Sequence, residues 1–255
     1  MRNLTIFTEF ILMYISSSRE LQVVQGLLLL VIYLGAFTGN LTIIVIVTDP
    51  HLHSPMYFFI GNLSLIDLCC ISVTVPKFIV NSLSGSKLIS LPGCAAQIFL
   101  FIFFGSTELA LLVVMSYDRY VAICHPLHYG LTITPHLCTQ AAGGSWASGL
   151  IYSIHTGTMF RLPFTESNVI HQYFCDIPQI LRIASSDVWF SEFIILVVRI
   201  FADLGPIADK TSLSNVLTGM FYSMVPPLIN PLIYSLRNRE INTALGQMFH
   251  RYFGN

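Results

Sequence analysis

Two carboxyl groups lie inside apolar runs, where ionisable side chains are rare. Asp67 stands within the run at about 57–80, and Glu108 stands within the run at about 95–117. An ionised group in hydrocarbon is costly unless it is paired or hydrated, so each carboxyl marks a functional site. At ~1.5 Å per helical residue, both lie ~16 to 18 Å from one membrane face. Carboxylates at the same depth repel each other unless they share a proton or a cation, and both alternatives stay open.

A fixed charge pair follows the second of these runs. Asp118 and Arg119 are flanked by two phenols, Tyr117 and Tyr120, and the segment continues to Pro126-Leu127. Such a pair at the end of a membrane helix belongs at the water boundary. Taken alone, it predicts a boundary salt bridge with no signalling role. Nowhere does the sequence offer a nucleophile, a base and an orienting group at compatible depths, so we do not expect an enzyme.

The elements that must hold these groups are membrane helices. Of the 255 residues, 54% are hydrophobic and only 10% are charged, whereas soluble domains average about 25% charged residues. Several uninterrupted apolar runs exceed ~18 residues, the length that crosses a bilayer as a helix. We therefore predict an all-α, polytopic transmembrane bundle that forms a single domain, 1–255. The net charge of -1 gives no support for a nucleic acid partner.

The runs predict five complete spans and one partial span. An N-terminal tail, 1–22, precedes spans at about 23–47, 57–80, 95–117 and 137–159, a partial span at 189–198 and a span at 213–236. The run at 189–198 gives only ~15 Å of helix, about half a bilayer. The segment 200–212 is polar and contains Gly205-Pro206, so it cannot complete that span. An apolar stripe that includes Ile241 and Leu245 predicts an amphipathic helix at 237–253, along the inner membrane surface.

Several ordered motifs resemble the olfactory receptors, a family of rhodopsin-like G-protein-coupled receptors. They are Leu-His-Ser-Pro-Met-Tyr-Phe-Phe at 52–59, the segment 115–127, His-Gln-Tyr-Phe-Cys-Asp-Ile-Pro at 171–178, and Pro-Pro-Leu-Ile-Asn-Pro-Leu-Ile-Tyr at 226–234. Trp146 matches the tryptophan with which the family packs its fourth helix. The resemblance implies a seven-helix fold from which this chain lacks most of the fifth helix, the third inner loop and nearly all of the sixth.

The resemblance assigns the two ends of the bundle different partners. It implies that a small volatile odorant binds between the helices and that a heterotrimeric G protein detects the resulting change. The family's arginine, here Arg119, is held at rest by the neighbouring acid. The residues implied in G-protein coupling are Asp118, Arg119 and Tyr120, and those of the activation motif are Asn230, Pro231 and Tyr234.

The ligand pocket is expected on the outward half of the third span. Its candidate residues lie one to three turns above Glu108, and they are Phe101, Ile102, Gly105 and Ser106. Simple helix packing is the alternative for this row of small and apolar residues. For Asp67 and Glu108 the resemblance implies a sodium site near Asn230, and a shared proton is the alternative. No other cofactor is expected.

Two features concern the outer side. Cys94 lies twenty-five residues before Arg119, a rise of ~37 Å along a helix, which exceeds the ~30 Å hydrocarbon core. It therefore emerges on the side that also holds Cys175, and topology in an oxidising compartment predicts a Cys94–Cys175 disulfide. This pairing matches the bridge that the family makes. Asn3 begins an Asn-Leu-Thr sequon, which predicts glycosylation if the N-terminus is outside.

The function expected from the sequence is that of an odorant receptor in the plasma membrane, multi-pass, with its N-terminus outside and lipid around it. The alternative is an incomplete, non-signalling product, retained in the endoplasmic reticulum or associated with full-length receptors. Its basis is the missing sixth helix, because the outward swing of that helix opens the G-protein cleft in the family. A small channel or carrier built on Asp67 and Glu108 is disfavoured, since internal repeats are lacking.

Overall fold

The computed structural model describes the first four spans and part of the C-terminal region. The described residues are 8–12, 18–48, 54–157, 168–170, 172–176, 227, 229–231, 233, 241, 243, 245 and 246. The predicted partial span at 189–198 lies outside them, as do Asn3, Tyr234 and most of 213–236 and 237–253.

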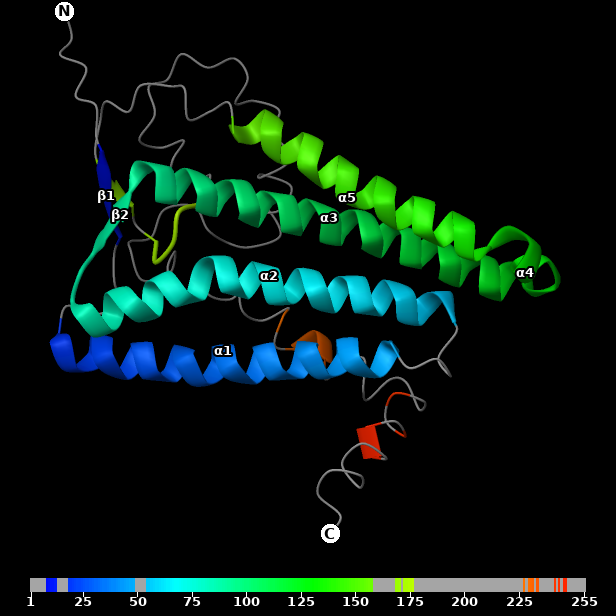
Figure 1. The fold of residues 1–255 in the computed structure, drawn as a ribbon, viewed down its shortest axis with the longest axis horizontal. Coiled ribbons are helices and arrows are strands. Elements are labelled where there is room, and N and C mark those ends of the chain that lie inside the picture. The colour runs from blue at the N-terminus through cyan, green and yellow to red at the C-terminus, as the bar shows by residue number, and fades with distance from the viewer. Residues whose placement is uncertain are drawn as a thin grey trace, which may run out of the picture.

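Four long helices form the body of the described structure. They are α1 (Arg19–Val47), α2 (Pro55–Ser84), α3 (Leu91–Cys124) and α5 (Pro135–Gly157). They lie side by side in that order, with alternating direction (Figure 1). A short 3₁₀ helix, Pro126–His128, and α4 (Tyr129–Thr132) connect α3 to α5. The end of the bundle that holds this connection is called the inner end, and the opposite end is called the outer end, after the orientation that the sequence predicts. Each predicted span from the first to the fourth is therefore a helix, and α3 continues past the predicted end at 117.

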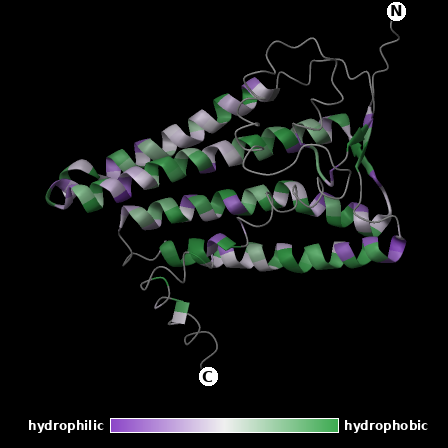
Figure 2. Ribbon diagram, turned by 180° about the vertical axis from the view of Figure 1, so that it is seen from behind, coloured by the Kyte–Doolittle hydropathy of each residue, from purple (hydrophilic) through white to green (hydrophobic). Residues whose placement is uncertain are grey.

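Within the described part of the chain, three helices are long and apolar enough to cross a membrane, namely α1, α2 and α3. Hydrophobic residues recur along the length of all three helices (Figure 2), and many of them are exposed. On α1, for example, Val24, Leu28 and Val31 are all more than half exposed. Exposed apolar side chains on a spanning helix face lipid rather than water. Helix α5 contains many small and polar residues, but its 23 residues correspond to ~34 Å, which also suffices to span the core.

Local sequence signals begin and end these helices. Ser18 caps α1 by accepting a hydrogen bond from the backbone N–H of Leu21 at 3.3 Å, and Ser90 does the same for α3 from Gly93 at 3.3 Å. These contacts satisfy donors that the first helical turn leaves unpaired. Helix α2 ends at Gly85, whose φ of 77° is left-handed and favours glycine.

A small sheet at the outer end was not predicted. It consists of β1 (Glu9–Leu12), β2 (Leu88–Ser90) and β3 (Val169–Ile170), in the order β2-β1-β3. Strand β1 is antiparallel to β2 and parallel to β3. Phe10 and Leu12 of the central strand are buried. Strands of two to four residues carry too little sequence pattern to be recognised, and here all three come from distant parts of the chain.

A close helix contact joins α3 to α5. A Cβ atom added at Gly149 of α5 would lie 2.8 Å from the backbone oxygen of Phe103 and closer still to the side chain of Thr107. Gly143 and Gly144, on the same helix, have nothing within 4 Å of such an atom. Of these three glycines, only Gly149 lets α5 approach α3 closely, and Gly143 and Gly144 face outward.

The contact at Gly149 predicts opposite effects for two identical substitutions. Gly149→Ala should lower the melting temperature of the purified chain by several degrees, because the new methyl group meets fixed backbone. Gly144→Ala should leave it unchanged or raise it slightly, because alanine is the better helix former by roughly 0.5–1 kcal/mol. Thermal unfolding in detergent measures both. Equal shifts would show that the α3–α5 approach does not depend on Gly149.

Candidate functional site

A polar cluster in the middle of the bundle joins the last predicted span to the first two helices. The side-chain amide of Asn230 donates a hydrogen bond of 2.8 Å to Asp67 Oδ2. The amide of Asn40, on α1, donates to the carbonyl oxygen of Pro227 at 2.7 Å and to that of Ala36 at 3.0 Å. Asp67 and Asn40 are almost fully buried. The two amides thus connect residues that are more than 160 positions apart in sequence.

Glu108 completes this cluster from α3. It is partly buried and lies close enough to Asp67 for the two charges to repel each other. Asp67 Oδ1 is buried and has no hydrogen-bond partner among the described residues. A buried, unpartnered carboxylate oxygen beside a second carboxyl suits either a shared proton or one monovalent cation. The described residues contain no group of three or more His, Cys, Asp or Glu that could hold a metal ion.

The first residues of the C-terminal apolar stripe pack against α1 and α2. Ile241 is fully buried in a cluster with Ile43 and Ile46 of α1 and with Tyr57 of α2, and Leu245 packs on this cluster. The stripe therefore contacts the inner ends of α1 and α2 at these two residues, in addition to any contact with the membrane surface.

At the inner end, the two members of the charge pair contact different groups. Asp118 is buried and accepts a 2.8 Å hydrogen bond from the hydroxyl of Tyr129, on α4. Arg119 is exposed, and its guanidinium donates to the sulfur of Met56 at the start of α2. The family resemblance implies that Arg119 is held by the adjacent acid. In the described structure the hydrogen-bond partner of that acid is instead the phenol of Tyr129.

The environment of Tyr129 keeps its hydroxyl protonated. Burial raises the pKa of Tyr129, and the hydrogen bond to Asp118 and the charge of that carboxylate raise it further, to about 12. A phenol that donates to a carboxylate loses this interaction when it ionises, which is why the pKa rises. Tyr129 is therefore a hydrogen-bond donor throughout the physiological pH range.

Three apolar side chains that follow the Asp118-Arg119-Tyr120 motif in sequence are highly exposed, and together they are here called the inner apolar patch. They are Ile123, at the end of α3, and Leu127 and Leu131, in the connection to α5, which are 76%, 92% and 80% exposed. Large exposed apolar residues can contact either lipid or a partner protein.

The candidate pocket residues line one side of the outer half of α3. Phe101, Ile102, Gly105 and Ser106 are all partly exposed. A Cβ atom at Gly105 would have nothing within 4 Å, so none of the described residues fills the space beside this glycine. Ser106 donates back to the carbonyl oxygen of Ile102 at 2.5 Å. The ring of Phe101 lies 5.4 Å from that of Phe174, a residue of the outer loop.

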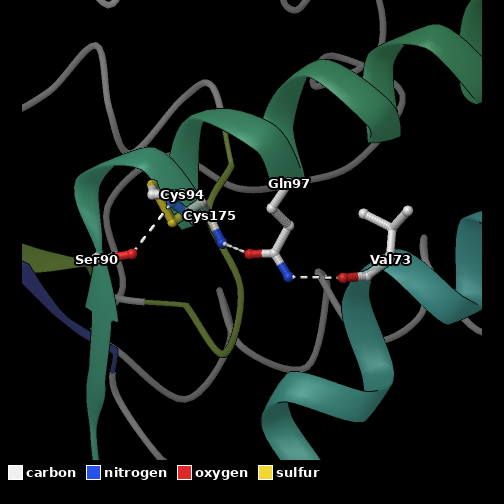
Figure 3. Close-up of a disulfide and its surroundings, with 6 residues drawn as sticks. Val73, Ser90, Cys94, Gln97 and Cys175 are labelled. Atoms are coloured by element: carbon white, nitrogen blue, oxygen red, sulfur yellow. Dashed lines mark hydrogen bonds between the residues drawn. A yellow bond between two sulfur atoms is a disulfide. The ribbon is translucent and has the colours of Figure 1, made fainter.

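A disulfide holds this outer loop to α3, as the sequence predicts. Cys94 and Cys175 are bonded, with their Cα atoms 5.4 Å apart (Figure 3). The segment 172–175 is buried, and its Tyr173 and Phe174 belong to the same apolar cluster as Phe78 of α2. The loop is therefore part of the core at the outer end of the bundle.

Sequence reasoning missed two hydrogen-bonding side chains and underrated a third. Tyr129 and Gln97 carry no motif of their own. Tyr129 bonds Asp118, 11 residues away, and Gln97 bonds Val73 and Cys175, which are 24 and 78 positions away. Trp146 was expected only to pack. It does contact the rings of Phe103 and Phe104, and its indole N–H also donates to the side-chain oxygen of Asn62 at 3.1 Å.

The match to a family model defines the class of protein. Residues 39–208 match the model of the 7 transmembrane receptor (rhodopsin family). The chain therefore belongs to the rhodopsin-like receptors.

Individual relatives narrow this class. The chain is 44% identical over 307 aligned positions to olfactory receptor 14I1 of Homo sapiens, covering 99% of both chains. It is 40% identical over 301 positions to olfactory receptor 14A16 of Homo sapiens, with 97% of each covered. To olfactory receptor 5B21 of Mus musculus it is 36% identical over 307 positions, with 99% of this chain and 96% of the relative covered. Within the rhodopsin-like receptors, it is a member of the olfactory receptor family.

The alignments also bear on the missing helices. An alignment of 307 positions is longer than the 255 residues of the chain, so it contains some fifty positions at which this chain has no residue. This agrees with the shortened bundle that the sequence predicts.

The contact between Tyr129 and Asp118 predicts a stability effect that does not vary near neutral pH. The folded-state pKa of Tyr129 is raised, so its contribution is complete below the ordinary pKa of 10 and is lost only as the pH approaches 12. Tyr129→Phe should therefore lower the melting temperature by the same amount at pH 6, 7.5 and 9. An offset that shrinks across this range would contradict a neutral phenol donor.

Proposed function

We propose that this protein is an odorant receptor that binds a small volatile ligand in the outer half of the bundle and signals to a heterotrimeric G protein at the inner end. The observation that carries the proposal is the alignment with olfactory receptors over nearly the whole chain. The distribution of polar and apolar groups along α3 supports it, because the outer half is apolar and the inner end is charged and exposed.

The proposed ligand site lies beside Phe101, Ile102, Gly105 and Ser106. Open space next to Gly105 and the ring of Phe101 suit a small, mostly apolar molecule. The hydroxyl of Ser106 can supply one polar contact. The nearby disulfide and the buried loop segment limit access from the outside.

The polar cluster is the proposed link between the ligand site and the inner end. Asn230 and Pro231 come from the last predicted span, and Asn230 bonds Asp67 of α2. A change at this contact would shift that span relative to α1 and α2. A shared proton or one sodium ion would lower the combined negative charge of Asp67 and Glu108 by one and so relieve their repulsion, and the fit of the residues favours neither.

The proposed G-protein surface combines Asp118, Arg119 and Tyr120 with the inner apolar patch. Arg119 and Tyr120 are exposed, and Leu127 exposes almost its whole side chain. An exposed cation beside exposed leucine offers both charge complementarity and apolar area, the two terms that a protein partner uses.

A second candidate is an incomplete receptor product that does not signal. The fifty or so alignment positions without a residue in this chain favour it. Such a product would remain in the endoplasmic reticulum or associate with full-length receptors. The receptor proposal instead requires the plasma membrane and an external N-terminus, glycosylated at Asn3.

Surface delivery and an odorant response separate the two candidates. Cells expressing the chain with an N-terminal tag should stain without permeabilisation, and glycosidase should shift the band of the wild-type chain but not that of Asn3→Gln. An odorant panel should then raise cAMP. Staining only after permeabilisation, together with no cAMP response to any odorant, would support the incomplete product.

The inner apolar patch predicts a coupling defect in a receptor that reaches the surface. Leu127→Ala should reduce the maximal odorant-evoked cAMP response at least several-fold, because an interface residue truncated to alanine can cost more than about 1 kcal/mol. Leu88→Ala removes an exposed leucine at the outer end and should leave the response unchanged. Equal responses from both variants at matched surface levels would remove Leu127 from the G-protein surface.

A further inference from the structure

Gln97 is a buried amide on α3 that connects three separate elements. Its Nε2 donates a 3.0 Å hydrogen bond to the carbonyl oxygen of Val73 on α2. Its Oε1 accepts a 2.9 Å hydrogen bond from the backbone N–H of Cys175 in the outer loop (Figure 3). The side chain is only 5% exposed. The amide of Gln97 thus uses its donor toward α2 and its acceptor toward the outer loop.

The α2 end of this bridge lies next to a break in the helix ladder. Pro76 stands inside α2 and has no backbone N–H, so the carbonyl of Ser72 loses its intrahelical donor. Val73 is the next residue in this turn, three residues before Pro76, and its carbonyl oxygen is the acceptor that Gln97 reaches.

The loop end of the bridge complements the disulfide. Cys94 and Gln97 are three residues apart on α3 and so share a face of the helix. The disulfide fixes the sulfur of Cys175, and the hydrogen bond from its N–H fixes the direction of the backbone. Because the loop is held at both points, the two side chains that precede Cys175, Tyr173 and Phe174, point in a defined direction.

Those side chains lie against the outer end of the candidate ligand site. The ring of Tyr173 is 5.3 Å from that of Phe78 on α2, and the ring of Phe174 is 5.4 Å from that of Phe101 on α3. Phe101 and Gly105 are four residues apart, so they share a face of α3. Phe174 therefore covers the helix one turn above the open space at Gly105.

We propose that Gln97 is a positioning residue that fixes the segment 172–175 as the outer wall of the ligand site, with Phe174 controlling access to the space beside Gly105. The inference rests on the proposed odorant-binding function and names the group that shapes the site. Gln97 itself contacts the loop and α2, and it acts on a ligand only through Phe174.

Hydrogen–deuterium exchange tests the positioning on the full chain in lipid nanodiscs, without any ligand. Gln97→Met keeps the length but removes both hydrogen bonds, and it should speed exchange of the Cys175 amide about five- to tenfold. Gln97→Glu, compared with the parent chain and with Gln97→Met at the same pH 5, where a buried carboxyl is largely protonated, keeps one donor and one acceptor and should restore the slow exchange of the parent chain. Ser90→Ala weakens the start of α3 but spares the loop, and it should not change this amide.

Thiol labelling tests the wall. Gly105→Cys places a thiol in the open space. An impermeant methanethiosulfonate reagent added outside should label this thiol slowly, after the labelling of the native cysteines in the parent chain has been subtracted. Adding Gln97→Met should speed labelling about tenfold, whereas adding Ser90→Ala should not. If Gln97→Met does not fold, Gln97→Asn, which is too short to reach both partners, should speed both reactions.

Unchanged exchange and labelling in the Gln97 variants would overturn the proposal, as would equal effects from Ser90→Ala. Neither measurement uses an odorant. A protected loop and a shielded thiol in a chain that answers no odorant would therefore leave the positioning role intact and count only against the proposed receptor function.

Discussion

In hydrocarbon, every polar group must find its partner inside the protein, and the arrangement of this bundle follows from that constraint. Three side chains with an amide or indole N–H reach across the described helices and end on a remote polar group. Asn40 meets the carbonyl of Pro227, Asn230 meets Asp67, and Trp146 meets Asn62. Because water cannot replace these partners, the contacts set which helices lie together and at what height. Apolar packing then fills the space between them.

The same constraint gives the two ends of the bundle different chemistry. At the outer end, the carbonyl of Val73 and the amide of Cys175 both bond to Gln97, and the disulfide holds the loop in the core. At the inner end, water and partner proteins are available, so Arg119 and the inner apolar patch can remain exposed. Asp118, which is buried, takes its hydrogen bond from Tyr129. The proposed ligand site at one end and the proposed partner surface at the other are thus separated by the length of α3.

The polar cluster between these ends is where the chain departs most from simple packing. The charges of Asp67 and Glu108 repel each other, and one oxygen of Asp67 lacks a partner among the described residues. A shared proton or a cation would weaken this repulsion. The hydrogen bond from Asn230 links Asp67 to the last predicted span. The chain makes this contact although it lacks some fifty positions of its aligned relatives.

The sequence by itself determined the first four helices, their order and the disulfide. These depend on properties local to one segment, such as hydrophobic length, caps at Ser18 and Ser90, and rise per residue. It also carried the family, since motifs are local. Only the tertiary structure decided which polar groups meet: Gln97 with Val73 and Cys175, Tyr129 with Asp118, and β1 between β2 and β3. The physical reason is that a hydrogen bond between distant segments depends on helix rotation and approach, as the bare surface of Gly149 against Phe103 illustrates, and no single segment encodes either.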